Sequence, residues 1–167
     1  MKIFALFIST LLIGYSSIFP TQKTEIKEYC NKYSVCVSYD SELLEGPSES
    51  ESQDGAHFYT ENEHNQMEMG TDYREQLDEY LELAGAAQLK KLYEDDQKNE
   101  DYEQVTYKKL GTNWYVLSGY LKKDGAKIIF YKKVIQSERL SYCMVQYEEA
   151  DKEYWNPVCK LVSSSFK

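Results

Sequence analysis

From residue 102 onward, apolar and polar positions alternate along the chain with a period of two. The alternation is interrupted only at Gly111-Thr112, at KKDG (122–125) and at QSE (136–138). Such alternation is typical of β-strands, and links this short join antiparallel neighbours, because a parallel crossover needs a dozen residues or more. The pattern therefore predicts a four-stranded antiparallel meander, with strands at QVTYKKL, NWYVLSGYL, AKIIFYKKVI and LSYCMVQY.

The first half of the chain predicts three shorter strands and one long loop. YSVCVSY (33–39) alternates strictly, while AHFYTEN (56–62) and QMEMGT (66–71) flank a polar turn. Between the first and the second of these strands, DSELLEGPSESESQDG (40–55) is rich in Ser, Glu, Gly and Pro, a composition that favours a loop. Residues 20–28 are mostly polar, so we expect an irregular lead-in there.

Two segments have the apolar spacing of helices. Asp72 is a good N-cap and Glu75 completes a capping box, after which one apolar stripe continues to the acidic run EDDQKNED (94–101). Near the C-terminus, Asn156 can cap a second helix with Pro157 in its first position. The two stripes consist of Tyr73, Leu77, Tyr80, Leu81, Ala84, Leu92 and Tyr93, and of Val158, Leu161, Val162 and Phe166.

The strand at 113–121 carries mostly apolar residues on both of its faces, which is typical of a central strand covered on both sides. One cover is expected from the helix that starts at Asp72 and the other from the C-terminal helix. The predicted fold class is therefore α+β, with an antiparallel sheet of about six to seven strands flanked by helices on both faces. The length suits a single domain, placed at residues 28–167.

The N-terminus predicts export. Lys2 precedes an apolar run from Ile3 to Ile13, and small residues follow at Gly14 and Ser16. This order is typical of a secretory signal peptide, and the run is too short for a good membrane anchor. We assign residues 1–19 to the signal peptide, with a cut after Ser16 or a few residues later. No later apolar run could span a bilayer, so we expect a periplasmic or extracellular protein.

Four cysteines in an exported chain favour disulfides over a zinc site, because no CxxC pair is present. Four cysteines allow three pairings, and the sequence does not choose among them. Adjacency of the predicted elements favours Cys143–Cys159, which would tie the last strand to the last helix. Cys30–Cys36 would then close a short loop ahead of the strand at 33–39.

The charge narrows the range of partners. The formal net charge is −9 at pH 7, so the chain repels phosphate backbones and anionic membrane surfaces. We therefore expect no nucleic acid among its partners. The two acidic runs, SESESQD (48–54) and EDDQKNED (94–101), lack the alternation of an EF-hand loop, and we interpret them as solvated faces rather than calcium sites.

Ser118, followed by Gly119, is a candidate nucleophile. However, it continues into Tyr120-Leu121 within a strand, whereas a hydrolase serine sits on a sharp turn between a strand and a helix. The interpretation we favour is that two small residues let a neighbouring element approach the sheet.

A second candidate site is HFYTENEHNQMEM (57–69). It holds His57, His64, Met67 and Met69, and imidazole with thioether suits copper, Cu(I) above all. The competing interpretation places both methionines in the core. The sixteen tyrosines are a third feature, because tyrosine rings can form a binding face as well as fill a sheet.

The sequence also resembles a known family. VTYKKLGTNWYVLSGY (105–120), IIFYKK (128–133) and the closing CKLVSSSFK (159–167) resemble an exported bacterial family, and the similarity extends over residues 33–167. That family is associated with the PsbP-like fold, which is shared with Mog-type Ran-binding proteins. The resemblance implies a protein-binding role without catalysis and transfers no catalytic residue.

Together these observations predict an exported accessory protein that binds another protein, without a cofactor and without enzyme activity. The alternative is a periplasmic copper-type metal binder that uses His57, His64, Met67 and Met69. A hydrolase with Ser118 as nucleophile is the third hypothesis.

Overall fold

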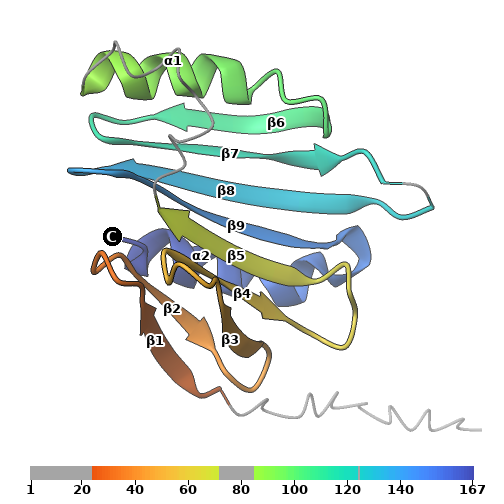
Figure 1. Cartoon of the computed structure of the whole chain (residues 1–167). Helices are drawn as coiled ribbons and strands as arrows, with labels where there is room; N and C mark the ends of the chain where they lie inside the picture. Colours follow the sequence, from red (N-terminus) through yellow and green to blue (C-terminus); the bar gives the residue numbers. More distant parts are fainter. Residues whose placement is uncertain (1–23, 72–84, 124) are drawn as a thin grey trace, which may run out of the picture.

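A computed structural model describes residues 24–71, 85–123 and 125–167. Seven strands form one antiparallel sheet in the order β3-β4-β5-β9-β8-β7-β6, and β1 and β2 form a separate antiparallel pair (Figure 1). The elements are β1 (Ile26–Cys30), β2 (Cys36–Asp40), β3 (Glu45–Glu49), β4 (Gly55–Tyr59), β5 (Gln66–Thr71), α1 (Ala86–Asp96), β6 (Tyr102–Leu110), β7 (Trp114–Leu121), β8 (Ile128–Gln136), β9 (Leu140–Glu148), the short 3-10 helix η3 (Glu149–Asp151) and α2 (Lys152–Ser165).

Two hydrophobic clusters pack against opposite faces of the large sheet. One cluster includes Phe58, Met67 and Trp155 and lies under α2 and the β1–β2 pair. The other includes Leu89 and Phe130 and lies under α1. The predicted class, α+β with an antiparallel sheet between helices, is confirmed. The meander of four strands, β6 to β9, is also present as predicted.

The β1–β2 pair corrects the prediction of an irregular lead-in at residues 20–28. Ile26 pairs with Asp40, and the pairing continues to Cys30 and Cys36, which are joined by a disulfide with an S–S distance of 2.08 Å. The residue at the other end of the chain extends this pair, because the backbone N–H and C=O of Lys167 both hydrogen-bond Cys36. The sequence did not indicate β1, because only Tyr29 of this strand is buried and an alternation of apolar and polar residues is therefore lacking.

Two further differences concern proline. The predicted loop at 40–55 contains β3, in which Pro47 lies on an outer edge of the sheet, where a missing N–H is tolerated. The C-terminal helix begins at Lys152 rather than after Asn156, so Pro157 lies inside it. Burial of Trp155, which is fully enclosed, explains the earlier start, since tertiary packing outweighs the loss of one helical hydrogen bond.

The predicted start of the first helix at Asp72, and the predicted signal peptide at 1–19, lie outside the described residues. Within the described ranges, α1 ends at Asp96, close to the predicted end. No helix in these ranges is long and apolar enough to cross a bilayer.

The Ser118-Gly119 pair lies in β7, between β6 and β8. A Cβ added at Gly119 would lie 1.8 Å from the carbonyl oxygen of Gln104 on β6. The register of β6 shifts on both sides of the Gln104-Val105 dipeptide, as at a β-bulge. Gly119 is therefore required because the backbone of an edge strand presses against it.

We expect Gly119→Ala to lower the free energy of unfolding by about 1–3 kcal/mol, because an inserted methyl group must displace backbone. Urea unfolding followed by tryptophan fluorescence measures the change. Gly70→Ala is a matched control, since its Cβ would meet only the ring of Tyr142, at 2.8 Å, and a side chain can move. Equal losses for the two variants would contradict this explanation.

Candidate functional site

A polar pocket of about 350 Å³ opens on the face of the sheet that carries α1. Its walls combine carboxylates, lysines, amides and two tyrosine rings. The lining residues are Glu68, Asn99, Asp101, Tyr102, Leu121, Lys122, Lys123, Lys132, Tyr142, Met144 and Gln146.

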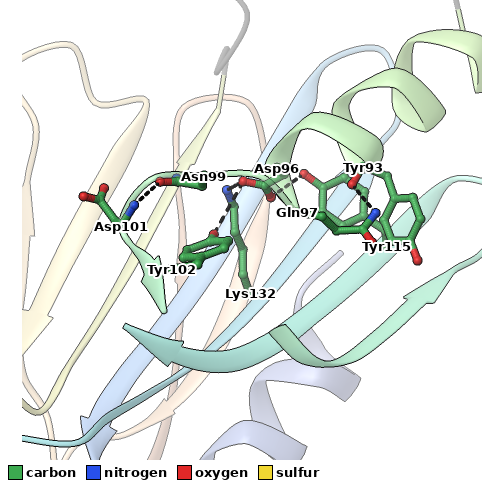
Figure 2. Close-up of polar contacts among 8 residues, drawn as sticks. All are labelled: Tyr93, Asp96, Gln97, Asn99, Asp101, Tyr102, Tyr115 and Lys132. Atoms are coloured by element: carbon green, nitrogen blue, oxygen red, sulfur yellow. Dashed lines mark hydrogen bonds and ion pairs between the residues drawn. The ribbon is translucent and has the colours of Figure 1, made fainter. Parts of the chain in front are cut away.

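Lys132, one of the lining residues, forms a buried ion pair with Asp96 (Figure 2). The Nζ of Lys132 lies 2.8 Å from Oδ1 of Asp96, and the two residues are only 4% and 6% exposed. The hydroxyl of Tyr115 donates to Oδ2 of Asp96 at 2.8 Å, and that of Tyr102 donates to Oδ1 at 3.5 Å. The last residue of α1 is thereby fastened to three strands, β6, β7 and β8.

Asp96 corrects the interpretation of EDDQKNED (94–101) as a solvated run. Its exposed neighbours, such as Glu94, do face solvent, whereas Asp96 does not. A signal was available in the helical spacing, because Leu89, Leu92 and Asp96 fall on the same face of α1. A carboxylate on an apolar stripe requires a buried cation, and the sequence did not indicate Lys132 as its partner.

We expect Asp96→Ala to cost about 3–5 kcal/mol of unfolding free energy, because it leaves the Lys132 ammonium buried without its counter-charge. The double variant Asp96→Ala, Lys132→Met should be more stable than Asp96→Ala alone. Chemical denaturation of the two variants tests this. A double variant less stable than the single one would show that the pair is not the source of the cost.

Glu68 lines the same pocket from β5. Burial raises the pKa of its carboxyl, and the positive charges of His57 and Lys132 oppose this rise only in part. A carboxyl with a raised pKa in the folded state favours folding while it is protonated. This contribution is lost as the pH rises from the unfolded pKa through the raised folded one.

Glu68→Gln should therefore gain stability relative to the wild type as the pH increases from about 4 to 8, since only the wild type must bury a charge. Urea midpoints measured across this range give the difference. Glu63→Gln, at an exposed position in the β4–β5 turn, is the control. A difference between wild type and Glu68→Gln that does not change with pH would contradict the assignment.

A second candidate surface lies on the opposite face, beside α2, and we call it the aromatic face. It consists of Tyr107, Trp114, Ser118, Tyr120 and Tyr131 on β6, β7 and β8. Tyr107 is 52% exposed, and Trp114, Tyr120 and Tyr131 are half-buried. This is the part of the sheet that α2 leaves open.

Two hollows adjoin α2 on the aromatic face. The first, about 230 Å³, is lined by Thr106, Tyr107, Ser118, Gly119, Tyr120, Ile129, Tyr131, Tyr147, Lys152, Asn156 and Cys159. The second, about 270 Å³, is lined by Asn113, Trp114, Lys133, Ile135, Gln136, Ser137, Phe166 and Lys167. The first lies beside the start of α2 and the second beside its end, so the open strip follows the whole helix.

The tyrosines of this face are held in place by neighbours. The hydroxyl of Tyr120 donates to Oε1 of Glu149 at 2.6 Å, which raises the pKa of Tyr120 and lowers that of Glu149. Tyr147 stacks on Trp155 with ring centroids 5.7 Å apart. Burial raises the pKa of Tyr131. The rings are thus fixed as neutral, amphipathic contact surface.

Ser118 has a structural partner. Its Oγ donates to the carbonyl oxygen of Phe130 at 2.7 Å. His57 and His64 both belong to the β4–β5 hairpin, and β4 lies four strand spacings from β7, about 19 Å away. The structure brings neither histidine of the chain to Ser118.

Three of the four residues of the copper hypothesis are divided between the two faces of the sheet, and His64 lies in the β4–β5 turn, where its backbone N–H donates to Oδ1 of Asn62 at 3.0 Å. Met67 and Met69 are 0% and 2% exposed and belong to the core beneath α2. His57 points the other way and shares a hydrogen bond of 2.7 Å with Gln66. In the described ranges, the one cluster with metal-ligating spacing is Glu28 with Cys30 and Cys36, whose thiols form the disulfide.

Of the two favoured disulfides, Cys30–Cys36 is formed, whereas Cys143 and Cys159 are free thiols. Cys143 is completely buried on β9, and burial raises the pKa of its thiol. The Cys159 thiol interacts with the hydroxyl of Tyr147, and burial raises its pKa to about 11. Cys143 belongs to the core under α2, whereas Cys159 is partly buried and lines the first hollow. The order of elements along the chain did not reveal this difference.

No protein-family model matches the chain, and no curated protein sequence does. Among solved structures, the chain is similar to the cyanobacterial PsbP protein CyanoP from Synechocystis sp. PCC 6803. The alignment has a TM-score of 0.52 and 12% sequence identity, and it covers 92% of this chain and 98% of that one. The fold is PsbP-like. At this identity the likeness concerns the fold alone, and a PsbP-like fold does not define a site.

Proposed function

We propose that this chain is an exported accessory protein without catalytic activity, which binds another protein through the aromatic face. The observation that carries the proposal is the strip of tyrosine and tryptophan side chains that α2 leaves open on β6 to β8. Tyr and Trp are enriched in protein interfaces because they bring large contact area and a polar group with little loss of side-chain entropy.

The shape of the aromatic face supports binding to a protein rather than enclosure of a small molecule. The two hollows, of about 230 and 270 Å³, are each smaller than the cavities of about 300–1,000 Å³ that bury a drug-sized ligand. A partner laid along α2 could occupy both hollows at once. Ser118, at the floor of the first hollow, contributes packing through its bond to Phe130.

Export to the periplasm or beyond fits the predicted signal peptide at residues 1–19. The Cys30–Cys36 bond is consistent with an oxidising compartment, where disulfides persist. The free thiols of Cys143 and Cys159 are compatible with the same compartment, because their raised pKa keeps both thiols protonated and a protonated thiol reacts slowly.

Site-specific photo-crosslinking in the source organism tests the proposal. A photoreactive phenylalanine analogue replaces Tyr107, and the control replaces Tyr59 on β4, which is 42% exposed and far along the sheet. We expect one defined protein to be captured at 107 and not at 59, identified by mass spectrometry. Capture of the same proteins at both positions, or at neither, would contradict a docking role for the aromatic face.

A further inference from the structure

We infer that the aromatic face accepts an extended, acidic segment of the partner, about seven residues long, with carboxylates near both of its ends. This inference rests on the proposed function and specifies the chemistry of the partner. Three features carry it, namely the charge of the lining, the position of the exposed lysines and the length of α2.

The charge of the lining is opposite to that of the chain. The formal net charge is −9, yet the residues that line the two hollows include Lys133, Lys152 and Lys167 and no acidic side chain. A fourth lysine joins them, since the Nζ of Lys109 lies 5.5 Å from the centroid of the Trp114 ring. A basic strip on an acidic protein attracts an acidic ligand.

One of these lysines has a structural role. Lys133 donates to the carbonyl oxygens of Ser163 and Phe166, at 2.7 and 3.0 Å, and so caps the end of α2. Lys109, Lys152 and Lys167 are exposed and form no ion pair within 4 Å in the described part of the chain. They are therefore the cations that a ligand can reach.

Glu149 lies beside this strip, and both of its carboxylate oxygens are already engaged. Oε1 accepts the hydrogen bond from Tyr120 at 2.6 Å, and Oε2 lies 3.3 Å from Nζ of Lys127. Lys152 lowers the pKa of Glu149 only as a minor, more distant influence. The positive end of the strip at Lys152 thus remains available.

The spacing of the lysines sets the length of the ligand. Lys152 is the first residue of α2 and Lys167 lies two residues beyond its end. The helix between them is about 20 Å long. An extended peptide spans this distance with about seven residues. Carboxylates at its two ends would reach Lys152 and Lys167, while the central residues lie over Tyr107, Tyr131 and Trp114.

A peptide array provides the probe. Seven-residue peptides with Asp-Glu at one end, Glu-Asp at the other and all combinations of apolar and aromatic residues in the three central positions are tested with the labelled mature protein. A second array has Asn and Gln in place of the acids. We expect binding to the acidic array only, at least tenfold weaker in 0.5 M NaCl than in 0.05 M, because salt screens exposed charges.

The best acidic peptide is then measured by fluorescence anisotropy. Lys152→Glu with Lys167→Glu should weaken its binding at least tenfold. The matched control is Lys123→Glu, an exposed lysine on the polar pocket of the opposite face, which should leave binding unchanged. Thermal unfolding of each variant verifies that the surface substitutions preserve the fold.

The outcomes separate this inference from the function on which it rests. No binding to any acidic peptide, equal binding to the neutral array, or equal losses in all charge variants would overturn the inference, even if Tyr107 captures a partner. Tighter binding to phosphatidylglycerol vesicles than to every peptide would also overturn it. Peptide binding as expected, without any capture at Tyr107 in cells, would support the groove and contradict its use in the proposed function.

Discussion

The unequal coverage of a wide sheet is the constraint from which the other features of this protein follow. Seven strands at about 4.8 Å spacing give each face a width of about 29 Å, whereas one helix covers about 10 Å. Among the described residues, each face carries a single helix. The β1–β2 pair covers the remainder of the α2 face over β4 and β5 (Figure 1). What stays open on that face is the strip over β6 to β8.

On the opposite face the same shortage of cover produces the polar pocket. α1 lies over the side of the sheet formed by β6 to β8, and its last residue, Asp96, is a buried anion that binds Lys132 of the pocket wall. Burying the charges of Asp96 and Lys132 costs desolvation energy. The ion pair itself and the hydrogen bonds from two tyrosine hydroxyls compensate for this cost without a large net gain in stability. Such a pair specifies position more than it stabilises, because a shifted helix would leave both charges unmatched.

Much of the large sheet was predictable because its strands are either alternating or continuously apolar and are joined by short turns. Interactions between distant residues were not. Asp96 looks like one acid in a polar run until Lys132, which is 36 residues away, is placed beneath it. Trp155 moves the start of α2 ahead of Asn156 because its ring needs the core, an effect that local capping preferences do not contain.

The candidate surface was visible only as an excess of tyrosines. Tyr107 and Tyr147 occupy similar strand positions in the sequence, yet one is 52% and the other 4% exposed. The difference depends on which strands α2 crosses, and that placement follows from Trp155 and from the pairing of Lys167 with Cys36. The same lack of tertiary information explains why a Cys143–Cys159 disulfide looked as reasonable from the sequence as the Cys30–Cys36 disulfide.

The disulfide joins two cysteines that are six positions apart, and this short separation has a consequence for the proposed export. In a chain threaded through a translocon from its N-terminus, Cys30 and Cys36 emerge together, more than one hundred residues before Cys143. Oxidation of the early pair removes both thiols from competition before the late ones appear. On the proposed export route, Cys143 and Cys159 can therefore remain reduced once the first pair has formed.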